Sequence, residues 1–253
     1  MGRLAAFDVE TTGIDTERDR IVTACVGLAG GARPTERFAW LVDPGIEIPA
    51  GATAVHGITT ARARAEGRDA AQAVEEITAV LAEQMLAGVP AIAFNARFDF
   101  TILDREARRH GLTPLVERVG GPLRLLVVDP FVLDKQLDRF RRGKRTLTAV
   151  CEHYRVPLDA AHDADADALA AARVAWRIAQ RNAEIAQAPL DALHARQVIW
   201  AAEQAVSLAA WFRDQGRDEH VPTDWPIVPH AAPAAAAAAT VTAAPAFAPP
   251  LAA

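Results

Sequence analysis

The hydrophobic and polar positions of the first part of the chain follow the pattern of β-strands. Apolar runs cover Leu4–Val9, Ile21–Leu28 and Phe38–Val42, and turns at Gly13 and Gly30–Gly31 separate them. Because the connections between the three runs are short, we expect the strands to pair antiparallel.

Helical and strand patterns alternate along the next part of the chain. The stretch from Pro44 to Thr60 is rich in proline, glycine and threonine, and is expected to form a loop. The elements predicted after it are a helix at Ala70–Leu86, a strand at Ala91–Phe94, a helix at Ala96–His110 closed by Gly111, a strand at Leu125–Val128, and helices at Phe131–Phe140, Leu147–Tyr154 and Ala164–Ala183. This order predicts an α/β fold with a mixed five-stranded sheet, three antiparallel strands followed by β-α units, flanked by helices.

The residues Leu190–Gln215 have the pattern of a further long helix. One face of this helix carries the apolar side chains of Ile199, Ala202, Val206 and Ala209. We expect it to pack on the preceding helix, against the face that carries Leu169, Ala172 and Trp176.

The end of the chain has a different composition. From about residue 229 it is almost entirely alanine and proline, without apolar periodicity, and is expected to be disordered. The predicted organisation is a domain of residues 1–185, a C-terminal helical extension of residues 186–228 and a tail of residues 229–253.

Composition limits the classes of protein to consider. Of the 253 residues, 51% are hydrophobic and 23% are charged, which is typical of a globular protein with a sizeable core. The net charge of −5 argues against a protein that coats nucleic acid by bulk charge alone. Two distant cysteines and the lack of a long apolar stretch indicate a cytoplasmic protein that does not associate with a membrane.

Two acidic residues lie at the end of the first predicted strand. Side chains two positions apart in a strand point to the same face, so Asp8 and Glu10 project together while Val9 faces the other way. Neighbouring carboxylates repel each other unless a cation lies between them. A metal site and a solvated strand end are both consistent with this pair alone.

Two further acidic positions coincide with helix starts. Asn95 follows a strand and could cap the next helix, whose first turn carries Asp99, where the helix dipole already favours a negative charge. At the later helix, Asp167 continues the core-facing stripe at helical spacing, whereas Asp165 points to the opposite side as a solvated cap. Because a buried carboxylate is costly unless it is paired or binds metal, Asp167 is the candidate ligand.

The ordered set of motifs resembles a known family. D-x-E-T-T-G on the first strand, F-N-x-x-F-D at a strand-to-helix turn and H-x-x-x-x-D before a long helix occur in this order between about Arg3 and Ala183. The set is similar to that of the DEDDh (DnaQ-like) exonucleases, the family of the proofreading epsilon subunit of bacterial DNA polymerase III. The resemblance implies a ribonuclease-H-like fold, removal of nucleotides from 3′ ends, and two divalent ions held by four carboxylates, Asp8, Glu10, Asp99 and Asp167. It also implies that His162 is the general base. Oxygen ligands suit Mg²⁺ or Mn²⁺.

The resemblance and the basic residues together predict contacts with substrate. Seven residues are expected to bind the terminal nucleotide: Thr11, Thr12, Val55, His56, Ile58, Asn95 and Phe98. Five cations upstream of the third motif could contact phosphates: Arg139, Arg141, Arg142, Lys144 and Arg145. A solvated charged loop is the alternative for these cations, and an ordinary turn is the alternative for the residues around His56.

Several functions remain open at this point. The preferred expectation is a 3′–5′ exonuclease acting on single-stranded DNA ends in proofreading or repair, with a DNA polymerase subunit as a potential partner. An RNA-trimming exonuclease, similar to oligoribonuclease, would use the same five residues, and the treatment of a 2′-hydroxyl would distinguish the two. A non-catalytic nucleic-acid-binding module or a ribonuclease-H-type endonuclease explains fewer of the motifs.

Overall fold

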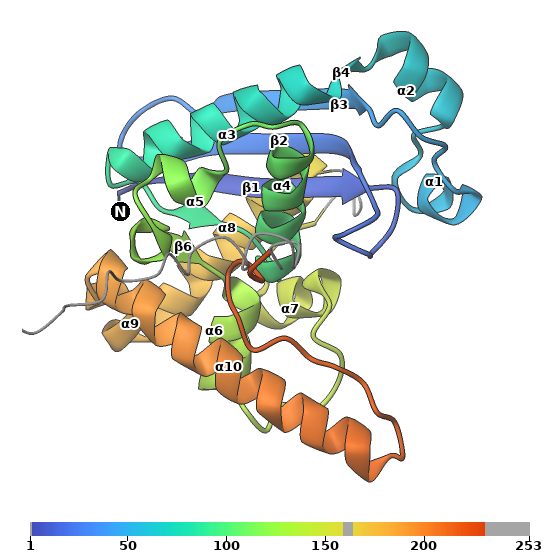
Figure 1. Cartoon of the computed structure of the whole chain (residues 1–253). Helices are drawn as coiled ribbons and strands as arrows, with labels where there is room; N and C mark the ends of the chain where they lie inside the picture. The colour runs from blue at the N-terminus through green and yellow to red at the C-terminus, as the bar shows by residue number, and fades with distance from the viewer. Residues whose placement is uncertain (1, 159–163, 231–253) are drawn as a thin grey trace, which may run out of the picture.

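Six strands form one mixed sheet in the computed structural model, which describes residues 2–158 and 164–230 (Figure 1). The strands are β1 (Arg3–Thr11), β2 (Ile21–Gly30), β3 (Glu36–Asp43), β4 (Arg68–Asp69), β5 (Ala91–Ile92) and β6 (Val127–Val128). Their order across the sheet is β4-β3-β2-β1-β5-β6. The first three strands pair antiparallel, as predicted, and β5 and β6 continue the sheet parallel to β1.

Helices cover both faces and one edge of the sheet. Their bounds are α1 (Ala50–His56), α2 (Thr60–Glu66), α3 (Ala70–Leu86), α4 (Arg97–Arg109), α5 (Leu115–Arg118), the 3₁₀ helix η1 (Pro122–Arg124), α6 (Pro130–Leu137), α7 (Leu147–Tyr154), α8 (Ala164–Arg181), α9 (Ala183–Gln187) and α10 (Leu190–Asp214). None of the helices within the described residues is both long and apolar enough to cross a membrane.

Alternate side chains of β1 belong to two separate cores. Phe7 and Val9 pack with the side chains of α3 and α4, and the ring of Phe7 meets that of Phe100 edge-on at 5.4 Å. Leu4 and Ala6, on the opposite face, pack with the side chains of α8. This division follows from the alternation of side chains along a strand, and it places Asp8 and Glu10 on the α8 face.

Six short elements were not expected from the sequence: β4, α1, α2, α5, η1 and α9. The predicted five-stranded sheet has a sixth strand, β4, whose two exposed polar residues give no apolar alternation to detect. The expected loop from Pro44 to Thr60 contains the whole of α1 and the start of α2. No residue of α1 is buried and only Ala63 of α2 is, so neither helix has the apolar stripe by which helices are predicted.

The long helix α10 closes the sheet edge at β6 instead of packing through the predicted face. The side-chain amide of Gln197 accepts a hydrogen bond from the Asp129 amide at 2.7 Å and donates one to the Val127 carbonyl at 3.1 Å. His194 Nδ1 accepts from the Val127 amide at 3.3 Å. The expected contact residues Ile199 and Val206 are each 58% exposed, so the prediction of this face was wrong. Polar side chains occupy the buried face because they pair with the open strand edge.

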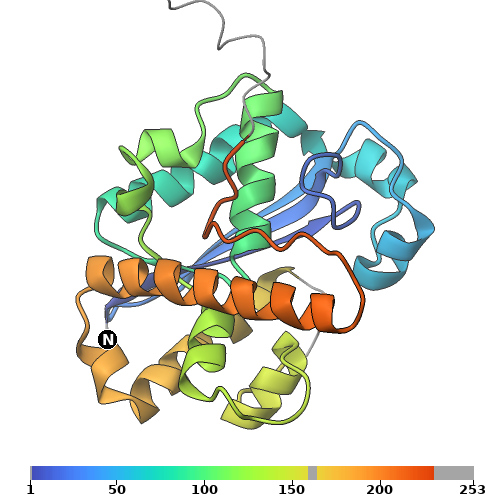
Figure 2. The ribbon, with the colours of Figure 1, turned by 60° about the horizontal axis from the view of Figure 1, so that its bottom comes forward.

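The chain after α10 returns across the molecule to α4 (Figure 2). The Val228 amide donates a hydrogen bond to Thr101 Oγ1 at 3.0 Å, and the Arg105 guanidinium donates one to the Val228 carbonyl at 2.9 Å. Trp225 is buried, with its ring 5.2 Å from that of His194. Almost all of the predicted tail, residues 231–253, lies outside the described residues.

Replacement of Gln197 by alanine is expected to destabilise the fold. The Val127 carbonyl and the Asp129 amide would be left unpaired in the interior, at about 1–3 kcal/mol for each group. Urea unfolding should show a lower midpoint for Gln197→Ala, whereas Glu203→Ala, at an exposed position of the same helix, should stay within about 0.5 kcal/mol of the parent protein. Equal midpoints for both variants would show that α10 does not hold the edge through this side chain.

Candidate active site

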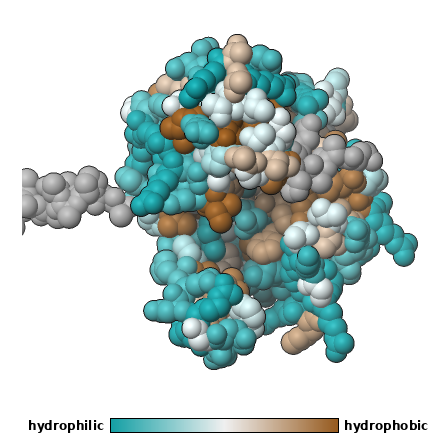
Figure 3. Space-filling view, turned by 90° about the vertical axis from the view of Figure 1, so that its right-hand side faces the viewer, coloured by the Kyte–Doolittle hydropathy of each residue, from teal (hydrophilic) through white to brown (hydrophobic). Residues whose placement is uncertain are grey.

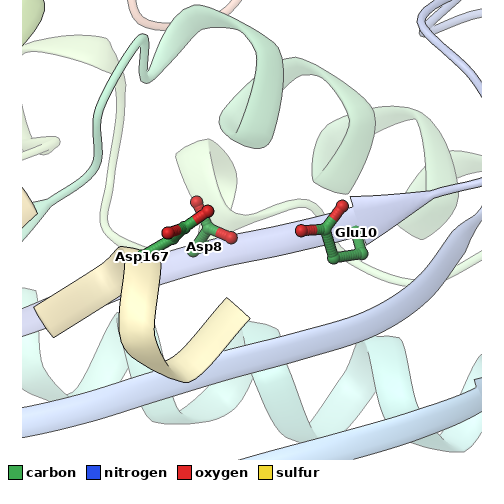
Figure 4. A group of neighbouring side chains, drawn as sticks. All are labelled: Asp8, Glu10 and Asp167. Atoms are coloured by element: carbon green, nitrogen blue, oxygen red, sulfur yellow. The ribbon is translucent and has the colours of Figure 1, made fainter. Parts of the chain in front are cut away.

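Three carboxylates meet where β1 ends and α8 begins. Oxygen atoms of Asp8, Glu10 and Asp167 all lie within 4.8 Å of one another. Figure 4 shows Asp8 and Asp167 side by side, with Glu10 further along the strand. The strand places the first two on one face, and α8, which packs on β1, brings its first turn to them. The predicted grouping of these three residues is therefore present in the structure.

This arrangement suits a divalent cation. Three negative charges at this separation repel one another, and a bound cation would remove the repulsion. All donor atoms of this group are carboxylate oxygens, which are the ligands that Mg²⁺ and Mn²⁺ prefer, and among the described residues no histidine nitrogen or cysteine sulfur joins it as in a typical zinc site. The donor set thus fits the metal class implied by the sequence.

Asp99 approaches the group from the opposite side of β1. It lies in the first turn of α4, is 4% exposed, and its Oδ1 accepts a hydrogen bond from the Val9 amide at 3.2 Å. This bond ties Asp99 to the backbone between Asp8 and Glu10, and Asp99 is close enough to Glu10 for their charges to interact. Burial raises the pKa of Asp99 well above its usual range, with neighbouring Asp129 and Glu10 adding to the effect. Asp99 is not part of the three-residue group defined above, and its role as a fourth ligand stays a prediction.

A buried carboxylate outside the predicted set holds the turn before α4. Asp129 Oδ1 and Oδ2 accept hydrogen bonds from the Asn95 and Ala96 amides, both at 3.0 Å. Trp225 Nε1 donates to the same carboxylate at 3.3 Å. Burial raises the pKa of Asp129 to about 6, against the lowering effect of its N–H donors. The expected helix cap by Asn95 is wrong, because Asn95 has a positive φ of 63° and the helix begins after Ala96 without a side-chain cap.

The sequence contains a local signal for Asp129. Asp129 precedes Pro130 at the end of a predicted strand, and an acidic residue followed by proline is a common start of a helix. In the structure Asp129 does cap α6, by accepting a hydrogen bond from the Phe131 amide at 2.9 Å. Its second role, toward Asn95 and Ala96, depends on tertiary contacts that spacing does not reveal.

The start of α8 is tethered to β3. Arg37 Nε lies 2.6 Å from Asp165 Oδ1, and Cys25 Sγ lies 3.3 Å from the same oxygen. Asp165 was expected to be a solvated cap, and that expectation is wrong because of this ion pair. Burial, together with the nearby Asp165 carboxylate, raises the pKa of Cys25 to about 12. The predicted general base, His162, lies outside the described residues.

A hollow of about 340 Å³ adjoins the carboxylates on the side of α1. Glu10, His56 and Ile58 line it, together with Trp40 and Arg62. His56 Nδ1 accepts a hydrogen bond from the Ile58 amide at 3.1 Å, and burial lowers the pKa of His56, against the opposing effect of the Thr11 backbone. The molecular face in Figure 3 is hollowed at its centre, with apolar side chains inside and polar ones on the rim.

The remaining expected nucleotide contacts differ in their surroundings. Val55 is 51% exposed and Asn95 is exposed, so both are accessible. The Thr12 hydroxyl donates to Asp19 Oδ1 at 2.8 Å and accepts from the Arg20 amide at 3.0 Å, so it is used within the turn between β1 and β2. A Cβ at Gly13 would come within 2.5 Å of the Asp19 carboxylate, which explains the glycine of the first motif.

The five cations expected to contact phosphates fall into two groups, those that pair with a buried carboxylate and those that are exposed. Arg141 lies 2.6 Å from the fully buried carboxylate of Asp134, and Arg145 pairs with the same group. Both cations therefore offset a buried negative charge inside the protein. Arg139, Arg142 and Lys144 are exposed and stay candidates for contact with phosphate.

A protein-family model described as Exonuclease, RNase_T, matches residues 5–175. The chain belongs to this exonuclease family. The three carboxylates Asp8, Glu10 and Asp167 lie within the matched stretch. The family and the fold expected from the sequence are confirmed.

Similar curated proteins are much longer than this chain. A DNA polymerase III subunit epsilon-like protein of Rhodobacter capsulatus is 41% identical over 103 residues, which are 40% of this chain and 14% of the relative. A PolC-type DNA polymerase III of Lacticaseibacillus paracasei is 25% identical over 179 residues, which are 71% of this chain and 11% of the relative. The chain thus spans about a seventh or less of these relatives.

Solved structures support the same fold. One structure of exonuclease I is similar with a TM-score of 0.62 at 19% identity, covering 73% of this chain and 42% of the other. The exonuclease I of Methylocaldum szegediense gives a TM-score of 0.56 at 22% identity, covering 83% of this chain and 46% of that one. At these identities the similarity concerns the fold alone.

Mn²⁺ is expected to stabilise the metal-free protein through the three carboxylates. Binding to the folded state alone adds about 2.7 kcal/mol at a hundred times the dissociation constant, which thermal unfolding would register as a higher melting temperature. Asp167→Asn should reduce this shift and, in EDTA, should stabilise the protein because one of three like charges is removed. Asp165→Asn, on the same helical turn, should keep the shift. If only Asp165→Asn loses the Mn²⁺-induced rise in melting temperature, the assignment of Asp167 as a metal ligand is wrong.

Proposed function

We propose that the protein hydrolyses single-stranded DNA from its 3′ end and releases nucleoside monophosphates, with two divalent ions at the carboxylate group. The observation that carries this proposal is the convergence of Asp8, Glu10 and Asp167 in a chain that belongs to the exonuclease family. Asp99, tied to the Val9 amide, lies close enough to Glu10 to serve as the fourth carboxylate.

The residues of the chain would divide the chemistry between them. When bound, two ions polarise the scissile phosphate and the attacking water and stabilise the leaving 3′-oxygen. Asp8, Glu10, Asp99 and Asp167 would hold them. His162 would accept the proton of the attacking water, because an imidazole titrates near neutral pH. His56 and Ile58, which line the adjoining hollow, would contact the terminal nucleotide.

The choice of DNA is supported by the names of similar proteins. The curated relatives are an epsilon-like subunit and PolC-type forms of DNA polymerase III, and solved exonuclease I structures contain dT13 and dA16 oligonucleotides. We further propose that the protein acts in the cytoplasm, in proofreading or repair, together with a DNA polymerase subunit.

The central test uses 5′-labelled single-stranded DNA and the matching RNA, with Mg²⁺, Mn²⁺ or EDTA. We expect a ladder that shortens from the 3′ end, requires metal, and forms faster on DNA. The double variant Asp8→Ala, Asp167→Ala should form no ladder. Faster shortening of RNA would replace the DNA proposal with an RNA-trimming activity, and binding without product under any metal would contradict the catalytic proposal.

A second test separates the proton acceptor from the metal ligands. His162→Ala is expected to lower kcat by roughly 10²- to 10⁴-fold, the range for loss of a general base. The same variant should keep the Mn²⁺-induced rise in melting temperature. His153→Ala, on α7, is the control and should leave both properties unchanged. If His162→Ala loses the metal response as well, the residue contributes to the metal site and is not a separate base.

A further inference from the structure

Two adjoining hollows lie between α6 and α10. The outer hollow has a volume of about 330 Å³. It is lined by Lys135 of α6, by Arg139 just after this helix, and by Trp211 of α10. The inner hollow, of about 180 Å³, reaches Asn95 and Arg97. Lys135, Gln204 and Leu208 line both hollows, so the two lie next to each other, and we refer to them together as the groove.

The inner end of this groove lies at the turn that carries the active site. Arg97 is the first residue of α4, and Asn95 lies two positions before it. The first turn of the same helix carries Asp99. The strand β6, which leads into α6, runs parallel to β1, so the groove and the carboxylates lie at the same end of the sheet. A chain whose last residue is held at the carboxylates could therefore continue past Asn95 into the groove.

Positive charge is concentrated along the groove. Burial lowers the pKa of Lys135, and the nearby charges of Arg145 and Arg97 lower it further against the raising effect of the Asp129 carboxylate, so these cations repel one another. Within the described residues, neither Lys135 nor Arg139 forms an ion pair with a carboxylate. The lining also carries two carboxylates, Glu203 and Asp129, and the charge of Asp129 attracts Lys135 and Arg97, but the three cations Lys135, Arg139 and Arg97 outnumber them. A phosphate would relieve the repulsion.

The outer end of the groove presents an aromatic ring. Trp211 is 52% exposed, and Leu208, which also lines the outer hollow, is 37% exposed. Cations beside an exposed aromatic side chain are the combination that binds single strands, in which the phosphates meet the charges and a base stacks on the ring. A paired duplex keeps its bases inside and gains nothing from the tryptophan.

We propose that the groove between α6 and α10 binds the single strand upstream of the nucleotide that is removed, through Lys135, Arg139 and Trp211. This inference rests on the proposed exonuclease function and adds a path for the substrate. It assigns a nucleic-acid contact to α10, which lies beyond the stretch matched by the family.

The test compares strand lengths at several salt concentrations. The double variant Lys135→Gln, Arg139→Gln should lose more kcat/KM on a long single-stranded oligonucleotide than on a dinucleotide, which is too short to enter the groove. For the long strand, the slope of log kcat/KM against log salt should flatten by roughly 1.4, about 0.7 for each phosphate that is no longer neutralised. The matched control Arg33→Gln, Arg173→Gln removes two exposed cations elsewhere and should leave the slope unchanged.

Trp211→Ala provides an independent test of stacking. This variant should lower kcat/KM on the long strand roughly tenfold, which is the effect expected when one base no longer stacks on an aromatic ring. Trp176→Ala, at the partly exposed tryptophan of α8, is its control. Equal reductions of kcat/KM on both substrate lengths, or no reduction on either, would contradict the proposed binding groove. A change of oligomeric state in Trp211→Ala without a lower kcat/KM on the long strand would contradict it as well. Failure of the parent protein to cleave either substrate would instead refute the proposed function.

Discussion

Four N–H donors converge on the buried carboxylate of Asp129, and the arrangement of the active site depends on this convergence. The donors are the amides of Asn95, Ala96 and Phe131 and the indole of Trp225. Removing a carboxylate from water is costly, and hydrogen bonds to a charged group, at about 1.5–3 kcal/mol each, offset that cost only when several are made together. One side chain thus fixes the start of α6, the turn before α4 and the segment after α10 relative to one another.

This junction determines where Asp99 lies. The turn held by Asp129 begins α4, and Asp99 in its first turn then reaches the Val9 amide between Asp8 and Glu10. The remaining carboxylate, Asp167, comes from α8 on the other face of β1. A site built from one strand and two helix starts on opposite faces of a sheet is held by rigid elements, so its like charges stay close even though they repel.

Periodicity predicted the parts of the fold in which side-chain polarity follows burial. The strands β1 to β3, the helix α8 and the orientation of Asp167 were found in this way, because apolar residues mark their buried faces. The same rule failed for α10, where Gln197 and His194 are buried because they pair with strand β6. It could not assign partners to charges either, so the ion pairs of Arg141 with Asp134 and of Arg37 with Asp165 were not anticipated.

The helix α10 covers the edge strand β6, but α10 lies outside the stretch of the chain that matches the exonuclease family. The family match ends at residue 175, whereas the edge strand is completed by Gln197. An uncovered strand edge is a template for pairing with other chains. If recombination moved only the matched stretch into another protein, it would transfer the group of three carboxylates together with an open edge. The new neighbour would have to supply a helix or a strand of its own before the transferred domain could remain a monomer.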